Sequence, residues 1–283
     1  MLYQAGLVLE GGGMKGAYTA GVLDFFLDKE IDFAKCYGVS AGAITLCSYL
    51  SKQRGRGYAT MTDYLDDKNY SGIYSLLKTG DFFNVEMCYD KIPNELNLYD
   101  YDAFEKNESR GYAVATNIRT GLAEYIPLRD MRTDIQAVRA SASLPLISRS
   151  VEIGGQLYLD GALADSIPLL HSMTDGNRKN VVILTKEVGF RRKPASQLKL
   201  IKMRYKRYPK VYELMKNRHN QYNSTMDFIQ EQVKSGNTFL IQPQRKSGVG
   251  RLEKDRDKLH ALYRTGYDEA AAQYDALMEF LTK

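Results

Sequence analysis

The amino-acid sequence predicts an α/β fold, and the order of its first elements carries that prediction. An apolar run at residues 5–10 leads into three consecutive glycines, and an amphipathic segment at 15–27 leads to a second apolar run at 33–39. Strand, helix and strand over so short a distance form a βαβ unit, whose strands lie parallel with a right-handed crossover. The chain has 283 residues, 44% hydrophobic and 26% charged. It is therefore long enough to bury a full core, as about two domains or as one large α/β domain.

In the first half of the chain, glycines separate the expected strands and helices. Residues 15–27 place Ala20 and Leu23 on one helical face, and the apolar run 40–50, which predicts a second helix, follows directly on the second strand. Residues 51–110 are polar, rich in Tyr and interrupted by Gly. That composition indicates short helices and loops, which we expect to cover one end of the sheet.

The second half carries signals for hairpins, strands and helices. A Gly-Gly pair between two strand-like runs is typical of a two-residue hairpin, and a short apolar run is typical of a buried strand. An aspartate at the start of a periodic segment predicts a helix N-terminus. On these signals we expect hairpins at 111–116 with 122–126 and at 151–153 with 156–159, helices at 134–141 and 226–234, strands at 181–184 and 238–241, and a helical tail from 255 to 281.

Several classes of protein are disfavoured. No stretch reaches 18 apolar residues, which argues against a transmembrane helix, and Glu10 interrupts the apolar run nearest the N-terminus, which argues against a secretory signal. Cys36, Cys47 and Cys88 form no CxxC pair and favour a reducing, cytoplasmic compartment. No HExxH motif or Cys/His cluster is present, so we expect neither a metal nor a cofactor.

The charge is unevenly distributed, although the net charge is only +5. Residues 186–218, here called the basic segment, hold twelve Lys or Arg and two Glu, a charge of about +10 that leaves about −5 for the rest. With Tyr205, Tyr208 and Tyr212 at headgroup level, the segment could make peripheral contact with an anionic membrane. It could also contact nucleic-acid phosphates, or form a solvated face. No nucleic-acid motif accompanies it, so no nucleic-acid partner is expected.

The run Gly38-Val-Ser-Ala-Gly42 is a GxSxG motif between an expected strand and an expected helix. In that context a sharp strand-to-helix turn exposes the serine oxygen, and the glycines allow the backbone to turn. The N-terminus of the following helix favours negative charge at this place. Serine is also a preferred helix N-cap, so Ser40 is either a nucleophile or an ordinary cap.

A glycine-rich loop, Gly11-Gly-Gly-Met-Lys-Gly16, follows the first strand. Successive amides such as those of Gly11, Gly12 and Gly13 can converge on one oxygen, as in the oxyanion hole of an acyl-transfer enzyme. In a parallel sheet this loop and Ser40 would lie at the carboxyl ends of adjacent strands, the usual position of such sites. Lys15 would add positive charge near the developing anion.

The same loop also fits the GxGxxG fingerprint of a dinucleotide-binding fold. That fingerprint expects an acidic residue at the end of the second strand, whereas this strand ends in Gly38-Val-Ser40. A Walker P-loop is excluded, because Gly16 is followed by Ala17 instead of Lys-Ser or Lys-Thr.

A serine nucleophile needs a base. The order Ser, Asp, His would suit an α/β-hydrolase triad, but His171, His219 and His260 lie in no recognisable loop motif. Asp160 ends an expected strand, and Gly161 permits a tight turn after it. A desolvated carboxylate there could accept the serine proton. Asp-Gly is also a common turn without any function.

Taken together and in this order, the three motifs resemble those of the patatin-like phospholipase family over residues 7–173. The resemblance implies an α/β three-layer sandwich with a central, mainly parallel sheet flanked by helices. It also implies a Ser–Asp dyad without histidine, with Ser40 as nucleophile and Asp160 as general base. The amides of Gly11 to Gly13 would then form the oxyanion hole, and Lys15 would occupy the basic position of that motif.

The resemblance also predicts how the chain is organised. We expect a catalytic domain over 5–175, while 176–283 completes the α/β domain with the basic segment and the helical tail. The run 139–145 is similar to the Ala/Ser-rich block that the family carries before the Asp strand, and we expect it beside the site. The remaining motif glycines are Gly16, Gly38, Gly42 and Gly161.

By this resemblance the protein is expected to be a serine hydrolase of carboxylic esters. Its substrates would be lipid or fatty-acyl esters, cleaved by an activity of the phospholipase A, lysophospholipase or esterase type. The alternative is a non-catalytic lipid- or nucleotide-binding regulator on the same fold. An NAD-type binder and a serine peptidase are further alternatives.

Overall fold

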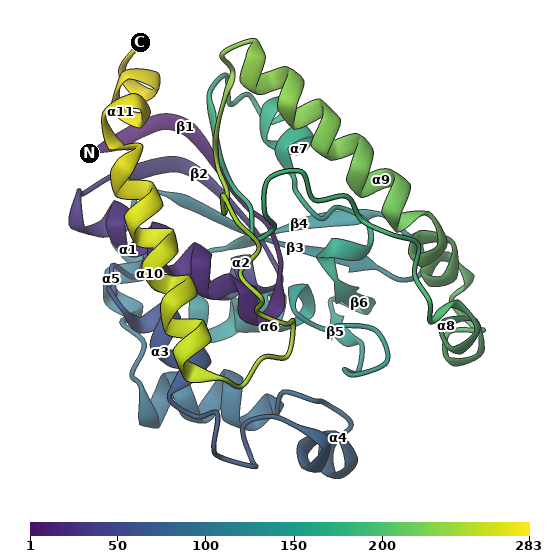
Figure 1. Ribbon diagram of the computed structural model, residues 1–283. Coiled ribbons are helices and arrows are strands. Elements are labelled where there is room, and N and C mark those ends of the chain that lie inside the picture. The colour runs from purple at the N-terminus through teal and green to yellow at the C-terminus, as the bar shows by residue number, and fades with distance from the viewer.

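An eight-stranded sheet forms the centre of the computed structural model, which describes residues 1–283 (Figure 1). The strand order is β5-β6-β3-β2-β1-β7-β8, and β4 pairs with β3. Strands β1, β2, β3, β7 and β8 are parallel, whereas β4, β5 and β6 join by antiparallel pairing. The strands are β1 (Leu2–Leu9), β2 (Asp32–Val39), β3 (Arg110–Asn117), β4 (Ala123–Leu128), β5 (Val151–Ile153), β6 (Gln156–Asp160), β7 (Asn180–Ile183) and β8 (Thr238–Ile241).

Helices cover both faces of the sheet, which confirms the predicted α/β sandwich. Leu7 and Leu9 of β1 belong to the larger core, while Val8 between them belongs to a second core on the opposite face. This alternation follows from the two-residue period of a strand. Helices α1 (Gly16–Asp28), α2 (Ala41–Leu50) and α10 (Arg256–Ala272) cover the first face, and α7 (Leu169–Thr174) and α9 (Pro209–Lys234) cover the second (Figure 1).

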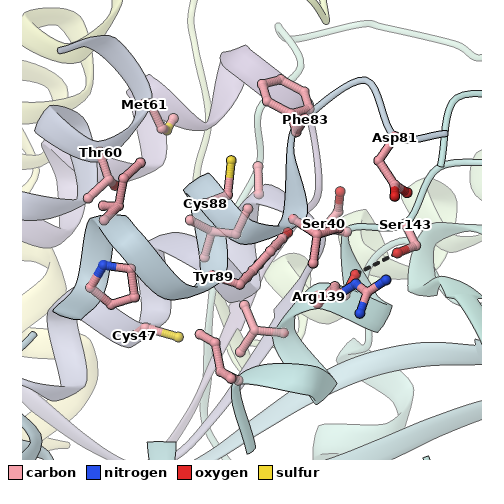
Figure 2. A pocket seen from close by; sticks show the side chains of 18 of the residues that line it. Ser40, Cys47, Thr60, Met61, Asp81, Phe83, Cys88, Tyr89, Arg139 and Ser143 are labelled. Atoms are coloured by element: carbon pink, nitrogen blue, oxygen red, sulfur yellow. Dashed lines mark hydrogen bonds between the residues drawn. The ribbon is translucent and has the colours of Figure 1, made fainter. Parts of the chain in front are cut away.

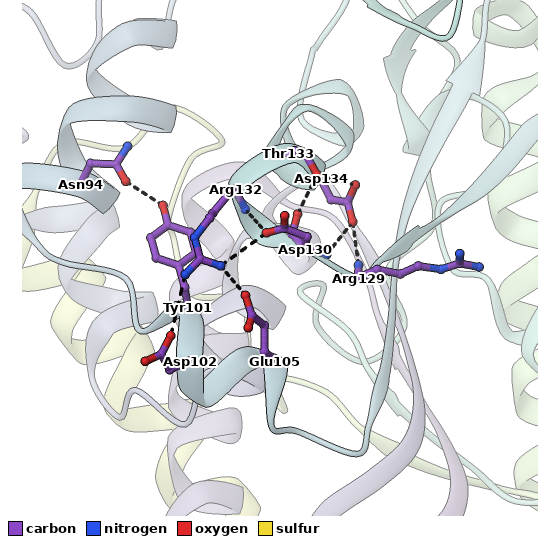
Figure 3. A network of polar contacts seen from close by, with 9 residues as sticks. All are labelled: Asn94, Tyr101, Asp102, Glu105, Arg129, Asp130, Arg132, Thr133 and Asp134. Atoms are coloured by element: carbon purple, nitrogen blue, oxygen red, sulfur yellow. Dashed lines mark hydrogen bonds and ion pairs between the residues drawn. The ribbon is translucent and has the colours of Figure 1, made fainter.

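Short helices between α2 and β3 form a cover beside the larger core, as the sequence predicts. They are α3 (Arg56–Thr62), α4 (Ile73–Thr79), the π-helix η2 (Met87–Leu96) and α5 (Tyr101–Glu105). Arg132 of α6 (Met131–Ser141) pairs with Glu105 of α5 and lies over the ring of Tyr101, whose hydroxyl donates to Asn94 at 2.7 Å (Figure 3). These contacts attach the cover to the helix that follows β4.

Three helix boundaries differ from the sequence-based expectation. Helix α6 begins at Met131 instead of Asp134, because Asp130 is the N-cap, and Asp134 accepts from the Asp130 amide at 2.9 Å. Helix α9 begins at Pro209 and is far longer than the predicted 226–234, since proline is well tolerated in a first helical turn. The predicted tail is divided into α10 and α11 (Tyr274–Thr282), with Gln273 between them.

The C-terminal residues extend the same sheet and pack against its first helix. Strands β7 and β8 continue the sheet beyond β1. Helix α10 crosses α1 so closely that a Cβ on Gly21 would lie 2.0 Å from the Tyr263 carbonyl oxygen, and one on Gly266 would lie 2.1 Å from that of Tyr18. The short helix α8 (Leu198–Arg204) precedes α9. None of the helices combines the length and apolar character needed to cross a bilayer.

Candidate active site

The register of β3 brings Ser40 and Asp160 together. Val39, the last residue of β2, pairs with Val114 of β3, and Asp160, the last residue of β6, pairs with the next residue, Ala115. Strand β4 pairs with this same stretch of β3, so it takes one of the two edges of β3. Strands β2 and β6 must therefore share the opposite edge, where they lie end to end and their carboxyl ends meet. Ser40 follows Val39 directly, and it lines the same cleft as Asp160.

Ser40 occupies a strained turn between β2 and α2. Its φ of 55° and ψ of −120° are rare for a residue other than glycine, and such strain costs about 1–3 kcal/mol. The Ser40 amide donates to the Ser141 hydroxyl at 2.8 Å. The flanking glycines are required by close packing: a Cβ on Gly38 would lie 2.6 Å from the Ala43 Cα, and one on Gly42 2.7 Å from the Leu9 carbonyl oxygen.

Asp160 is buried, and one of its carboxylate oxygens is unpartnered. Oδ1 accepts from the Ala162 amide at 2.8 Å, whereas Oδ2 is buried without a hydrogen-bond partner. Burial raises the pKa of this carboxyl, and the side chain of Ser40 and the charge of Arg218 oppose that shift. Gly161 completes the turn, since a Cβ there would lie 2.1 Å from the Val114 carbonyl oxygen.

The glycine-rich loop lies against the same turn. A Cβ on Gly11 would lie 2.9 Å from the Ser40 Cβ, so the loop and the serine are in direct contact. The amides of Gly11, Gly12 and Gly13 donate no hydrogen bond within the protein. Three backbone donors beside Ser40 are therefore free to bind an anion.

The next residues of the loop have structural contacts. Lys15 closes the 3₁₀ turn η1 (Gly13–Lys15) and lines neither of the two cavities described below. Gly16 begins α1, and a Cβ on it would lie 2.9 Å from the Ala41 Cβ at the start of α2. The close contact of these two helix starts requires glycine at position 16.

An apolar cavity of about 130 Å³ begins at Ser40 and extends beneath the cover (Figure 2). Of its 28 lining residues, 19 are hydrophobic, so a hydrocarbon chain would be desolvated along it. Ile44 comes from α2, Met61 from α3, Tyr89 from η2 and Ile135 from α6. We refer to this space as the apolar cavity.

A smaller space, here called the polar cleft, lies on the other side of Ser40. It measures about 20 Å³ and has only two hydrophobic residues among its 13 lining residues. Ser40, Gly13 and Leu144 line both spaces, so the serine stands at their junction. The charged residues of the polar cleft are Glu10, Asp160, Lys186, Arg192, Arg218 and Arg251.

Glu10 has a structural role in the polar cleft. It is fully buried, and its carboxylate accepts from the Thr185 amide at 2.7 Å, the Thr185 hydroxyl at 3.0 Å and the Tyr222 hydroxyl at 2.8 Å. These bonds join the ends of β1 and β7 to α9. Asp160 is therefore the carboxylate of this cleft that keeps an unpartnered oxygen.

The structure adds contacts that the sequence did not assign. Ser141 lies in the Ala/Ser-rich block 139–145 and binds the Ser40 amide, while the carbonyl oxygen of Ser143 accepts from the Asp160 amide at 2.8 Å. The block thus contacts both residues of the expected dyad. The three histidines line neither cavity, and His171 stacks on Tyr125. No cluster of three or more His, Cys, Asp or Glu side chains could hold a metal ion.

Known proteins define the class to which the chain belongs. The sequence model of the patatin-like phospholipase family matches residues 7–172, which is more than half of the chain, and the chain therefore belongs to this family. Residues 208–282 match a second model, described as a domain of unknown function (DUF6363). The second match begins close to the start of α9 and extends to the end of α11.

Individual proteins are also similar to this chain. The uncharacterized protein YjjU of Escherichia coli (strain K12) is 28% identical over 184 residues, which is 63% of this chain and 51% of YjjU. The probable lipid hydrolase 463L of Invertebrate iridescent virus 6 is 25% identical over 200 residues, 63% of this chain and 66% of that protein. The matched region thus spans about half to two thirds of these relatives.

Two further proteins match most of this chain. The uncharacterized protein YqhO of Bacillus subtilis (strain 168) is 24% identical over 289 residues, 89% of this chain and 96% of YqhO. Among solved structures, VipD from Legionella pneumophila aligns with a TM-score of 0.48 and 13% identity, over 97% of this chain and 67% of that one.

Proposed function

We propose that the protein is a lipid acyl hydrolase that cleaves carboxylic esters with Ser40 as nucleophile and Asp160 as general base. One observation carries the proposal: Ser40 and the unpartnered Oδ2 of Asp160 meet where an apolar cavity joins a cleft with free backbone amides. Membership of the patatin-like phospholipase family supports the same reaction class. The protein would accordingly be a serine hydrolase acting on carboxylic esters.

The first half of the reaction transfers the acyl group to the enzyme. Asp160 Oδ2 takes the proton of Ser40 while Oγ attacks the ester carbonyl carbon. The carbonyl oxygen becomes an oxyanion, which the amides of Gly11, Gly12 and Gly13 stabilise. The carbon–oxygen bond to the alcohol then breaks, and the alcohol leaves with the proton from Asp160.

The second half releases the fatty acid. Water loses a proton to Asp160 and attacks the acyl-enzyme carbonyl, and Ser40 leaves with that proton restored to its oxygen. A buried base has a raised pKa and binds the proton more strongly than an exposed aspartate does. The apolar cavity would hold the acyl chain through both steps, where hydrocarbon burial favours binding.

Labelling with a fluorophosphonate probe tests the dyad directly. Wild type should react at one site, and Ser40→Ala and Asp160→Asn should each lose the label, whereas Ser235→Ala, on an exposed surface, should keep it. Circular dichroism checks that every variant is folded. Labelling that persists in Ser40→Ala would remove the proposal. A folded wild type that never reacts would favour the alternative, a non-catalytic lipid- or nucleotide-binding regulator.

We also propose that the basic segment makes peripheral contact with an anionic membrane. Three of its twelve cations, Lys186, Arg192 and Arg218, line the polar cleft instead of facing outward. On α8, by contrast, Leu200 and Met203 are exposed among lysines and arginines. Exposed apolar side chains surrounded by cations are the pattern that binds anionic lipid surfaces.

A further inference from the structure

Arg56 lines the apolar cavity without a carboxylate partner. Three charged side chains line this cavity, namely Arg56, Asp81 and Arg139. Asp81 is buried and pairs with Arg149 at 2.7 Å, while the Arg139 guanidinium donates to the side chain of Gln136 at 3.1 Å. Arg56 forms no ion pair at all. The otherwise apolar wall therefore carries a positive charge that the protein leaves unbalanced.

Arg56 lies at the end of the cavity away from Ser40. Ile44 and Cys47 of α2 line the cavity one helical turn apart, so the cavity follows this helix. At 1.5 Å per residue, Cys47 lies about 10 Å along the helix from Ser40, and Figure 2 shows the two side chains well apart. The Tyr99 hydroxyl donates to the Cys47 carbonyl oxygen at 3.0 Å, and the Arg56 guanidinium lies 5.0 Å from the centre of the Tyr99 ring.

The contacts of Arg56 hold its guanidinium in place but leave donors free. A guanidinium has five N–H donors. One terminal nitrogen donates to the Ser48 hydroxyl at 3.4 Å, and the other donates to the Asn97 carbonyl oxygen at 3.0 Å. Nε is buried without a hydrogen-bond partner. A buried donor without an acceptor is unfavourable, so an acceptor supplied by a ligand would stabilise this arrangement.

The surroundings of Arg56 do not compensate its charge. Burial lowers the pKa of Arg56, and the groups that oppose this shift are the Cys47 thiol and phenols such as those of Tyr99 and Tyr101. Thiols and phenols are neutral near pH 7. A buried charge without a counter-ion is destabilising, whereas a carboxylate can accept two parallel hydrogen bonds from a guanidinium. An anionic group that enters the cavity would therefore find its partner at Arg56.

We propose that Arg56 selects acyl chains that end in a carboxylate, so that the protein hydrolyses half-esters of dicarboxylic acids. This inference rests on the proposed function, because it places the scissile ester at Ser40. The methylene chain would lie along the apolar wall and the terminal carboxylate at Arg56. About eight carbons in an extended chain cover the distance, since each carbon–carbon bond is about 1.5 Å and successive bonds zigzag. Hydrolysis with water would release the alcohol and the free dicarboxylic acid.

Two pairs of ethyl esters test this selection. Within each pair the acyl chains have the same number of carbons, and only one of the two ends in a carboxylate. The long pair is monoethyl octanedioate with ethyl octanoate, and the short pair is monoethyl butanedioate with ethyl butanoate. Release of ethanol measures hydrolysis, and all four esters are used as monomers in solution, so a membrane surface plays no part.

Wild type should prefer monoethyl octanedioate to ethyl octanoate by at least about ten-fold in kcat/KM, a factor typical of one hydrogen bond to a charged group. The short pair should show no such preference, because its carboxylate would stop in apolar surroundings before it reaches Arg56. Equal kcat/KM within the long pair would overturn the inference. A preference as large in the short pair as in the long pair would indicate a cation near Ser40, such as Arg139, and would also overturn it.

Arg56→Gln should remove the preference within the long pair, chiefly by raising the KM of monoethyl octanedioate, and should leave ethyl octanoate hydrolysis near its wild-type rate. Arg56→Met is the second variant, in case Arg56→Gln does not fold. Arg54→Gln is the matched control, because Arg54 is exposed and pairs with Asp28. It should keep the wild-type preference.

Two results with the variants would contradict the role of Arg56. The first is a preference within the long pair that survives in both Arg56→Gln and Arg56→Met. The second is an equal loss of kcat/KM for the two long esters, because that loss would show that Arg56 only supports the fold.

Binding to the Ser40→Ala protein separates the selection from the reaction. Calorimetry should detect monoethyl octanedioate, and the signal should disappear when Arg56→Gln is added. If wild type hydrolyses none of the four esters, the proposed function alone fails, and this assay decides the inference. Binding that depends on Arg56 would then support it, whereas no binding, or binding that Arg56→Gln leaves intact, would overturn it.

Discussion

The Met14 amide donates a hydrogen bond to the Arg251 carbonyl oxygen at 3.0 Å. This contact holds the loop before α10 against the glycine-rich loop, next to the free amides of Gly11 to Gly13. Arg251 also lines the polar cleft with its side chain. The C-terminal region is therefore part of the wall of the candidate site, although the family match ends at residue 172.

Gly13→Ala should disrupt this wall. Gly13 has a φ of +58°, and a Cβ there would lie 2.4 Å from the Arg251 carbonyl oxygen. Either the loop before α10 or the free amides must move, so turnover of a soluble ester should fall by about 100-fold or more. Gly250→Ala is the control, since its Cβ would enter open space. Equal activity of Gly13→Ala and wild type would contradict an oxyanion-binding role for this loop.

Ser141→Ala should impair the turn at Ser40. The variant leaves the buried Ser40 amide without its acceptor, which costs about 1–3 kcal/mol of unfolding free energy in a urea titration. It should also lower kcat with KM nearly unchanged, because Ser141 positions the nucleophile without lining either cavity. Ser143→Ala is a milder change, since the bond to Asp160 uses the Ser143 backbone carbonyl. If Ser141→Ala lost stability but kept a normal kcat, the role of Ser141 would be purely structural.

Activity should depend on the ionisation of Asp160. Burial raises its pKa above the 3.8 of an exposed aspartate, and the base must be ionised to accept a proton. Hydrolysis of a neutral ester should therefore decline as the pH falls through that raised pKa. Arg218→Gln removes a charge that lowers this pKa, so the acidic limb should move to higher pH. If the acidic limb of the pH–rate profile lies at the same pH in Arg218→Gln and in wild type, the result would contradict Asp160 as the titrating base.

The membrane proposal predicts a loss of vesicle binding on charge reversal. The triple variant Lys199→Glu, Lys206→Glu and Arg207→Glu changes exposed residues in and after α8. At about 1 kcal/mol for each cation, binding to phosphatidylglycerol vesicles should weaken at least about 100-fold in a sedimentation assay. Turnover of a short soluble ester should not change.

A double variant that reverses the charges of Lys106 and Lys234 serves as the control for the vesicle assay, because both lysines are exposed and lie outside the basic segment. This double variant should bind vesicles nearly as wild type does. Equal vesicle binding by the triple variant and wild type would remove the membrane role of the basic segment.

Local patterns in the sequence predicted most elements of the fold. The βαβ unit, both hairpins and the strands β7 and β8 form where periodicity and turn residues indicated them. The errors were at helix boundaries, as at Pro209, because no residue of α9 between Val211 and Tyr222 is fully buried and the apolar period is weak there. Such boundaries depend on what the helix packs against, and a single sequence does not display its neighbours.

The sequence alone determined the strand-to-helix turn at Ser40, the glycine-rich loop and the turn at Asp160, because each is local chemistry within a few residues. The tertiary structure decided what surrounds them. The register of β3 places Asp160 beside Ser40, and the folding of the C-terminal region turns Lys186, Arg192 and Arg218 toward the cleft. A run of basic residues has the same sequence pattern whether its side chains face solvent or a binding site, because charge along a chain does not specify where each side chain points. Only packing of the chain against itself determines which cations face inward.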